Sequence, residues 1–249
     1  MIELRQFRIS PYNEKIRWIL DFKGIPHRRV DLLPGPHAVW ALLHTGHTTT
    51  PMLRMDGAWI RNSADILARV EERFPEPPLY PADAEERARA LEIQRRFDDE
   101  WGPRMRRAIF GRALQHPSWG AETFGGGQGP RVKALYVAAF PMLRGVVAKA
   151  NGVTPESAVD GERAIGEALE WVAGSLRGGY LVGERFTLAD LCAASFVAMV
   201  VDPPDSTMTR PKPAPEPLEE LMAQWAAHPA VAWMQDIYRR HRGVSAVVA

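Results

Sequence analysis

The sequence has very little cysteine, with Cys192 as the single example in 249 residues. One cysteine excludes an intramolecular disulfide, a paired-cysteine redox motif and a cysteine-based zinc site within the chain. This usage is compatible with a reducing compartment. Cys192 itself lies inside an apolar helical pattern, so we expect it to be a core residue.

Net charge and long apolar runs are also lacking. Lys and Arg number 31 against 30 Asp and Glu, a formal net charge of +1. So weak a field makes nucleic acid and anionic membrane surfaces poor partners. No apolar stretch reaches membrane-spanning length, and the first residues lack the basic-then-apolar order of a secretory signal, so we expect a cytoplasmic protein. The hydrophobic fraction of 46% is that of a globular protein with a core.

The first eighty residues alternate short strand and helix patterns, which predicts a small mixed sheet with helices against it. The expected elements are a strand at 2–9, a helix from Pro11 to Gly24, a strand at 27–32, a hairpin at 51–61 and a helix capped by Ser63. A loop is expected between the second strand and the hairpin. Asp56-Gly57 supplies the strong two-residue turn signal of that hairpin.

Prolines between positions 75 and 81 indicate a linker, and the pattern after it is helical. The expected helices are 84–113, bent at Gly102-Pro103, then 130–150, 162–176, 188–201 and 217–242. The glycine-rich stretch 120–129 is expected to be a mobile loop, and the six prolines of 203–217 indicate a surface connection. We therefore expect an α/β domain at 1–78 and an all-α domain at 84–249.

Ser10 stands where the first strand leads into the first helix, so backbone N–H groups and the positive end of the helix dipole converge beside it. An anion is favoured there. The simpler interpretation is that Ser10 only caps the helix, which is the commonest use of such a serine. No GxSxG elbow or nearby histidine supports a hydrolase nucleophile.

Two further short motifs lie at the ends of elements. Pro51 begins a strand, and a cis bond after Thr50 would turn the Thr50 backbone outward for an extended peptide-like ligand, although a trans bond is the simpler alternative. Asn62-Ser63 begins the helix expected after the hairpin. It offers a carboxylate site through the Ser63 hydroxyl and the N–H groups at the helix start.

The most specific pattern is structural. In residues 180–195, Thr187 and Asp190 form an N-capping box, and Phe186 with Leu191 a hydrophobic staple. With these motifs, the first eighty residues resemble the thioredoxin-like domain of a cytosolic glutathione S-transferase of the serine-type, bacterial-like kind. The remainder resembles its all-helical C-terminal domain. The resemblance covers nearly the whole chain and implies a thioredoxin-like fold for residues 1–78.

The resemblance implies roles for particular residues. Ser10 would stabilise the glutathione thiolate, with Tyr12 and Asn13 as alternatives. Thr50 would pair through its backbone with the cysteinyl part of glutathione, and Pro51 would be the cis proline.

The resemblance also assigns Ser63 to the γ-glutamyl carboxylate of glutathione. Asn62 stands beside it where the family usually has an acidic residue, and Thr48 and Thr49 replace a lysine that would reach the glycine carboxylate. His47 is the candidate substitute for that lysine.

Other polar clusters have plain interpretations. His44 and His47 lie in an expected loop without a carboxylate or thiolate at ligand spacing, so we expect no zinc site and no metal. The arginines from Arg87 to Arg112 alternate with acidic residues, as on a solvated helix face. The acceptor-pocket candidates on this helix, which could equally serve in packing, are Trp101, Met105 and Phe110.

The implied activity is conjugation of glutathione, as co-substrate, to a small apolar electrophile, a detoxification reaction. The family resemblance implies a homodimer. The alternative is a non-catalytic binding or scaffold protein that kept the fold, favoured by the missing lysine and by Asn62. A glutathione-dependent thiol oxidoreductase is disfavoured, because position 10 is serine and the first domain has no cysteine.

Overall fold

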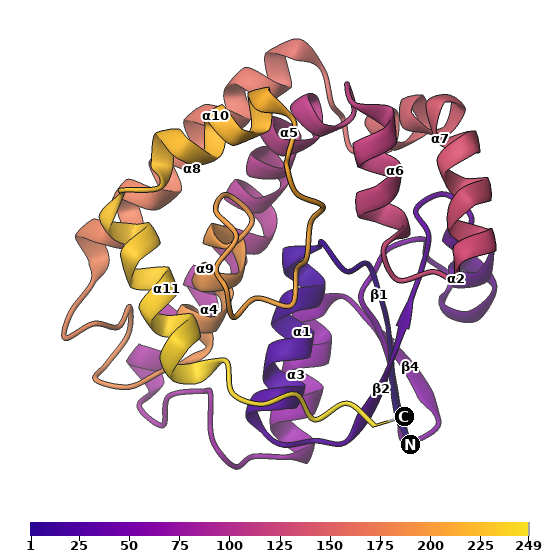
Figure 1. Ribbon diagram of the computed structural model, residues 1–249. Coiled ribbons are helices and arrows are strands. Elements are labelled where there is room, and N and C mark those ends of the chain that lie inside the picture. Colours follow the sequence, from indigo (N-terminus) through magenta and orange to yellow (C-terminus); the bar gives the residue numbers. More distant parts are fainter. Residues whose placement is uncertain (249) are drawn as a thin grey trace.

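The computed structural model describes residues 1–248 and shows a small mixed sheet joined to a larger helical part (Figure 1). The strands are β1 (Ile2–Gln6), β2 (His27–Asp31), β3 (Met52–Met55) and β4 (Ala58–Arg61). The helices of this part are α1 (Pro11–Phe22), α2 (His37–Thr45) and α3 (Ser63–Arg73). The strand order is β2-β1-β3-β4, with β2 parallel to β1 and the other two pairs antiparallel.

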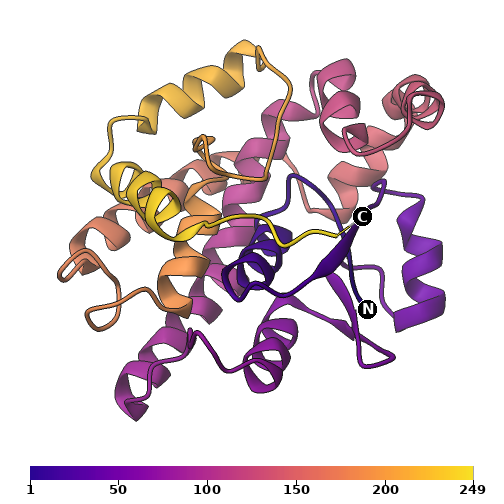
Figure 2. The same ribbon diagram turned by 60° about the horizontal axis from the view of Figure 1, so that its bottom comes forward.

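Helices cover both faces of the sheet. Figures 1 and 2 show α1 and α3 together on one side of the strands and α2 on the other. α1 begins at Pro11, where the missing proline N–H costs no helical bond, and it buries Ile16 and Leu20. The hairpin turns at Asp56 and Gly57 with positive φ angles of 52° and 85°. These angles suit the Asp-Gly pair and confirm the predicted turn.

The helical part follows the linker. Its elements are α4 (Ala84–Arg95), a π-helical turn (Arg96–Trp101), α5 (Gly102–Ala113), α6 (Pro117–Gly125), α7 (Pro130–Ala150), α8 (Pro155–Ser175), α9 (Leu188–Val197), α10 (Glu216–Trp225) and α11 (Pro229–His241). The first long helix is predicted to be bent at Gly102-Pro103. In the structure its irregular part is this π-helical turn, which ends directly before Gly102. Gly102 is required after it, because a Cβ there would lie 2.3 Å from the Phe196 ring of α9.

Two segments expected as loops are helical. α2 includes His44, and its N-cap position is Pro36 without a capping side chain, so the sequence carries no start signal for it. α6 occupies the first part of the glycine-rich stretch 120–129. Its glycine allows close packing, since a Cβ on Gly120 would lie 2.9 Å from the Phe140 ring of α7. The prediction of a mobile loop is therefore wrong as far as Gly125.

Two other expectations need correction. The helix expected at 217–242 is two helices, because Pro229 starts α11 after α10 has ended. Residues 203–217 form the expected connection before α10, but they do not stay on the surface. Met208 is buried, and the Thr207 hydroxyl bonds the Glu14 carboxylate of α1. The segment is therefore part of the packing between the sheet and the helices.

The capping box at α9 is present as predicted. The Thr187 N–H donates to Asp190 Oδ2 at 2.9 Å, and the Leu181 N–H donates to Asp190 Oδ1 at 2.8 Å. Burial raises the pKa of Asp190 to about 6. Cys192 of the same helix is fully buried, which confirms its prediction as core, and burial raises the pKa of its thiol to about 12.

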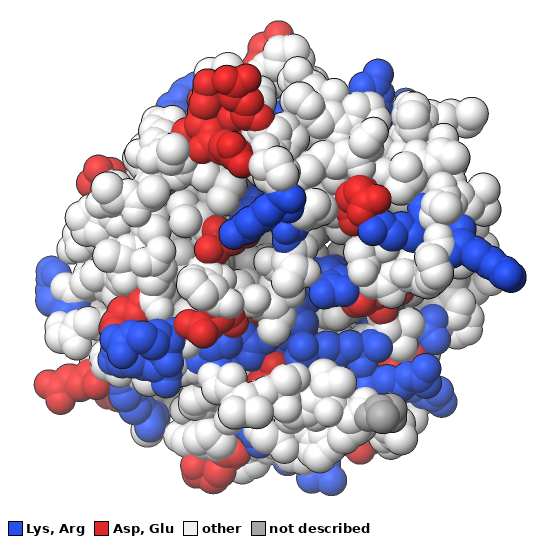
Figure 3. All heavy atoms as spheres, viewed as in Figure 1, with Lys and Arg blue, Asp and Glu red and all other residues white. Residues whose placement is uncertain are grey.

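The last described residues return to the sheet. Val247 bridges His27 of β2 in parallel, and the Val248 N–H donates to the His27 carbonyl at 2.9 Å. In this region of Figure 1 the chain crosses in front of α1, and Lys and Arg atoms form a band across the same face in Figure 3. Within residues 1–248, each helix is too short or too polar for a membrane-spanning segment.

Candidate functional site

A cavity of about 430 Å³ lies between the sheet and the helices. Its walls come from the start of α1, the start of α2, the segment before β3, helices α5, α6 and α7, and the residues after α9. Ser10, Thr48, Thr49 and Thr50 give the wall on the sheet side hydroxyl groups, whereas the helical wall is mostly apolar. Such an enclosed site with few polar groups suits a small organic ligand.

Ser10 has the backbone but not the side-chain contact of an N-cap. Its φ and ψ are −89° and 127°, and its carbonyl accepts the N–H groups of Asn13 at 3.1 Å and Glu14 at 2.9 Å. The hydroxyl makes no capping hydrogen bond within residues 1–248, and Ser10 lines the cavity. The capping interpretation therefore leaves the Ser10 hydroxyl unexplained.

Asn13 joins α1 to the segment before β3. Its Nδ2 donates to Thr50 Oγ1 at 3.2 Å, which holds Thr50 beside the start of the helix. The peptide bond between Thr50 and Pro51 is cis. The pairing between β1 and β3 begins only after this bond, at Met52 opposite Arg5. Thr50 is therefore not part of the sheet, and it lines the cavity.

Tyr12 contributes its ring to the cavity, but its hydroxyl is already engaged. The hydroxyl donates to the Asp98 carbonyl at 2.7 Å, and the ring meets the Phe196 ring edge-on at 4.9 Å. Burial raises the pKa of Tyr12 well above its usual value. A hydroxyl committed to a backbone acceptor is a poorer donor to a bound thiol than Ser10.

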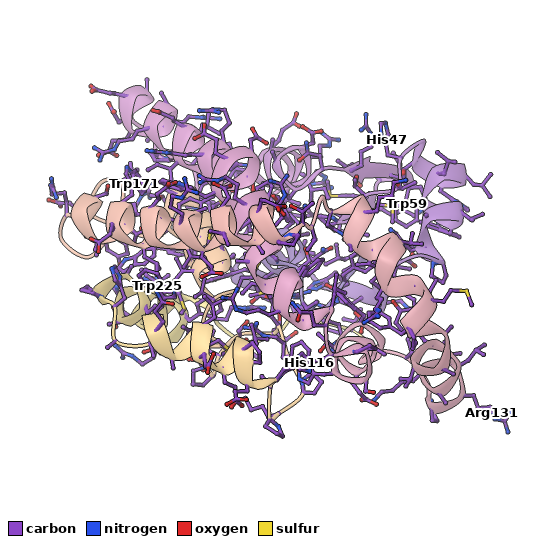
Figure 4. All side chains as sticks on the ribbon, turned by 90° about the horizontal axis from the view of Figure 1, so that it is seen from above. His47, Trp59, His116, Arg131, Trp171 and Trp225 are labelled. Atoms are coloured by element: carbon purple, nitrogen blue, oxygen red, sulfur yellow. The ribbon has the colours of Figure 1, made fainter. Side chains whose placement is uncertain are left out.

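Five predicted glutathione contacts lie outside the cavity wall as the described residues form it, namely Asn13, His47, Pro51, Asn62 and Ser63. Asn62, and not Ser63, caps α3, because Asn62 Oδ1 accepts the Ala64 N–H at 3.0 Å. Ser63 is the nearly buried first residue of that helix, and Asn62 is exposed. His47 is exposed, and Figure 4 places it at the edge of the molecule. These residues can therefore meet only a ligand that extends beyond the cavity.

The apolar wall is one face of α5. Ile109, Phe110 and Ala113 follow at helical spacing and line the cavity, and the assignment of Phe110 to an acceptor pocket stays a prediction. Trp101 and Met105 belong instead to the large core cluster, where they are 3% and 0% exposed. The packing interpretation of these two residues is the right one, and their assignment to the acceptor pocket is corrected.

Sequence reasoning missed three charged or titratable residues of the cavity. His37 of α2 has Nε2 at 2.9 Å from the Thr48 carbonyl oxygen, and burial lowers its pKa. Arg210 comes from the proline-rich segment, and its Nε donates to Asp202 Oδ1 at 2.8 Å. Neither has a sequence signal, because each reaches the cavity only through tertiary packing.

Arg106 of α5 is the third missed residue. Its surroundings in the sequence suggested a solvated helix face, yet it lines the cavity. It stands three and four residues before Ile109 and Phe110, at the spacing that places all three on one helix face. An arginine on the same helix face as these apolar residues is the sequence signal that could have identified Arg106 as a cavity residue.

Two family models match this chain. The model of the glutathione S-transferase N-terminal domain matches residues 4–78, and that of the glutathione S-transferase C-terminal domain matches residues 132–240. Together they cover most of the sequence. The chain belongs to the glutathione S-transferase family.

Family relatives with curated descriptions match over a short region only. A chloroplastic glutathione S-transferase of Arabidopsis thaliana, DHAR3, is 31% identical over 71 residues, which is 28% of this chain and 27% of the relative. DHAR2 of the same plant is 26% identical over 69 residues, which is 28% of this chain and 32% of the relative. The match thus spans about a third or less of these transferases.

Solved transferase structures match over almost the full length. One from Xanthobacter autotrophicus has a TM-score of 0.62 at 19% identity, covering 98% of this chain and 96% of that one. One from Methylobacterium radiotolerans, in complex with glutathione sulfonate, has a TM-score of 0.55 at 21% identity, covering 93% and 92%. This likeness confirms the fold class, a thioredoxin-like domain followed by a helical domain.

Proposed function

We propose that this protein is a serine-type glutathione transferase, which conjugates the glutathione thiolate to a small, largely apolar electrophile. The observation that carries the proposal is Ser10, which lines the cavity at the start of α1 and whose hydroxyl caps nothing within residues 1–248. It donates a hydrogen bond to the glutathione sulfur. The positive end of α1 favours the thiolate over the thiol.

The segment before β3 holds the middle of glutathione in this proposal. The Thr50 backbone pairs with the cysteinyl part of the tripeptide, in the manner of an added strand. The hydrogen bond from Asn13 to Thr50 supports this role, because it holds Thr50 beside the start of α1. Tyr12 contributes ring surface beside the thiol.

The two ends of glutathione extend past the cavity. Ser63, with Asn62 beside it, receives the γ-glutamyl carboxylate at the start of α3, where the helix dipole is positive. His47 and Thr48 stand at the other end, near the glycine carboxylate. Since neither is a lysine, we expect glutathione to bind more weakly here than in a relative with a full charge at that end, by about 1.5–3 kcal/mol at most.

The site needs only modest energies to activate the thiol. An ordinary hydrogen bond contributes about 0.5–1.5 kcal/mol, and a helix terminus about 0.3–1 kcal/mol. Together these raise the thiolate-to-thiol ratio by roughly four- to seventyfold. In the reaction, the sulfur forms a bond to an electrophilic carbon, and the leaving group departs with its electron pair. The apolar wall of α5, with Phe110, holds the electrophile.

The test combines binding and turnover. Calorimetric titration with glutathione at neutral pH should show binding, and conjugation to chlorodinitrobenzene should be measurable. Ser10→Ala should lower kcat/KM by about two- to twelvefold while glutathione affinity stays close to the parent value. The matched control is Ser118→Ala, an exposed serine on α6.

Two results would contradict the proposal in different ways. Full activity in Ser10→Ala, together with lost activity in Tyr12→Phe, would move the catalytic role to Tyr12. Absence of glutathione binding in the parent protein would favour the non-catalytic scaffold, which the substitution at Asn62 and the missing lysine support.

Other parts of the proposal come from family likeness. We carry over a homodimer, a cytoplasmic location, a detoxifying role, the absence of a metal cofactor, and the domain division at 1–78 and 84–249. The single cysteine supports a reducing compartment, because it offers no disulfide within the chain. Light scattering after gel filtration tests the dimer directly.

A further inference from the structure

An arginine heads the apolar face of α5. Arg106 lines the cavity together with Ile109, Phe110 and Ala113 of the same helix. The other three side chains give the acceptor wall its apolar character. A guanidinium in such a row needs an explanation, because desolvating a charge is costly unless something pairs with it.

Other arginines of α5 bond to carboxylates, whereas Arg106 bonds to none in the described part of the chain. Arg104 bonds Asp160 at 2.8 Å, and Arg112 bonds Glu162 at 2.8 Å. For Arg106, no hydrogen bond or ion pair is found with any residue from 1 to 248, and its Nε is buried without a partner. Burial lowers the pKa of Arg106, but a guanidinium remains protonated in proteins.

The remaining charges around the cavity do not compensate Arg106. The cavity wall contains no Asp or Glu among the described residues. Arg210 is neutralised by Asp202, and burial keeps the pKa of His37 low, so that this histidine is neutral at pH 7. Arg106 is therefore the one uncompensated charge on the wall that the described residues build.

Its position favours the acceptor over glutathione. Arg106 lines the same cavity as Ser10, Pro11 and Tyr12 at the start of α1. The glycine end of glutathione is expected at His47 and Thr48 in the segment before β3, whereas Arg106 belongs to α5. An anion at Arg106 would lie on the α5 wall beside Ile109 and Phe110, where we place the electrophile, and so belongs to the electrophile.

We propose that the electrophile carries a carboxylate, which Arg106 binds while Ile109 and Phe110 contact its apolar body. This inference rests on the proposed function. A planar guanidinium can donate two parallel hydrogen bonds to a carboxylate, which fixes the direction of the substrate. The carboxylate takes no part in bond changes. When an aryl chloride reacts, the carbon–sulfur bond forms, the carbon–chlorine bond breaks, and chloride leaves.

The test is a pair of electrophiles of similar shape and different charge, a chloronitrobenzoate and the matching chloronitrobenzamide. After division by the uncatalysed rates, the parent protein should prefer the benzoate by about ten- to hundredfold in kcat/KM. Arg106→Gln should abolish the preference, and Arg106→Lys should restore part of it. Arg131→Gln is the control, since Arg131 is exposed and points outward from the start of α7 in Figure 4.

Binding of nitrobenzoate and nitrobenzamide, which have no leaving group, separates this inference from the proposed function. If no conjugation occurs but nitrobenzoate binds the parent more tightly than Arg106→Gln, the anion site stands and the transferase activity fails. The inference is overturned if the parent protein and Arg106→Gln prefer the benzoate over the benzamide to the same extent. A loss of glutathione affinity in Arg106→Gln with an unchanged preference also overturns it, because Arg106 would then serve glutathione.

Discussion

Polar and charged residues lie on two sides of α1, and the two sides differ in whether these residues have partners. We call these sides the two flanks of α1. On the flank toward the C-terminal segment, Glu14 is fully buried, and its carboxylate pairs with Arg17 at 2.8 Å and with Arg242 at 3.1 Å. On the flank toward the cavity, Ser10 has a hydroxyl with no capping role, and Arg106 has no carboxylate partner within residues 1–248.

The difference separates structure from function. A buried charge is tolerated when it is paired and hydrogen-bonded, and losing one partner leaves the other uncompensated. The Glu14 flank is complete in itself and joins the C-terminal segment to α1. The Arg106 flank is incomplete, and a bound ligand completes it. Changes on the first flank should therefore alter stability, and changes on the second should alter binding and turnover.

The largest expected effect breaks the paired flank. Glu14→Gln keeps the shape of the side chain but removes the charge that Arg17 and Arg242 face, so unfolding free energy should fall by about 3–5 kcal/mol. Urea denaturation measures it. Glu72→Gln, in an exposed pair with Arg69, should cost about 1 kcal/mol or less. Equal losses in the two variants would show that burial adds nothing to the Glu14 pairs.

A second pair of variants sharpens the comparison within α5. Met105→Ala, in the core, should lower the unfolding free energy by about 2–5 kcal/mol. Phe110→Ala, on the cavity wall, should instead lower kcat/KM for the apolar electrophile, with a smaller loss of stability. Denaturant midpoints and kinetics on the same samples give both readouts. The opposite pattern would return Met105 to the acceptor pocket.

The paired flank should also make the protein sensitive to acid. Opposing the cost of burial, Arg17 and Arg242 hold the pKa of Glu14 at about 2, below its usual value of 4.5. The carboxylate therefore stabilises the fold above pH 4.5, and up to about 3 kcal/mol is lost as pH falls from 4.5 toward 2. Urea denaturation across this range should show a smaller acid loss in Glu14→Gln than in the parent. Parallel curves would contradict the assignment.

The smallest expected effect concerns a residue on neither flank. Thr187→Ala removes the buried capping hydroxyl of α9 and should cost about 0.5–2 kcal/mol in unfolding free energy, with kcat/KM unchanged. Thr154→Ala, which removes the exposed cap of α8, should cost less. A denaturant midpoint equal to that of the parent would show that the Thr187 cap is dispensable.

Much of the fold was predictable because its signals are local. The Asp56-Gly57 turn, the Pro11 helix start and the box of Thr187 and Asp190 each depend on residues a few positions apart. α2 lacks a cap and was missed. The helix through Gly120 was missed because glycine suggested mobility, whereas Gly120 serves contact with a ring far along the chain.

The candidate site was predictable only on the side made by strand and helix ends. Ser10 and Thr50 stand at such ends, and both reach the cavity. The helical wall depends on how distant elements pack, so nothing near Arg210 or His37 in the sequence indicates the cavity. Trp101 and Phe110 are both aromatic residues of one long helical segment, and only their packing tells core from cavity.

The most direct test of the central claim is the ultraviolet titration of the glutathione thiolate in complex with the parent protein and with Ser10→Ala. Since the Ser10 hydroxyl and the start of α1 both favour the anion, the pKa of the bound thiol should lie clearly below that of free glutathione. In Ser10→Ala that pKa should rise, while the helix terminus keeps it below the free value. A bound thiol with the same pKa in both proteins would contradict the account.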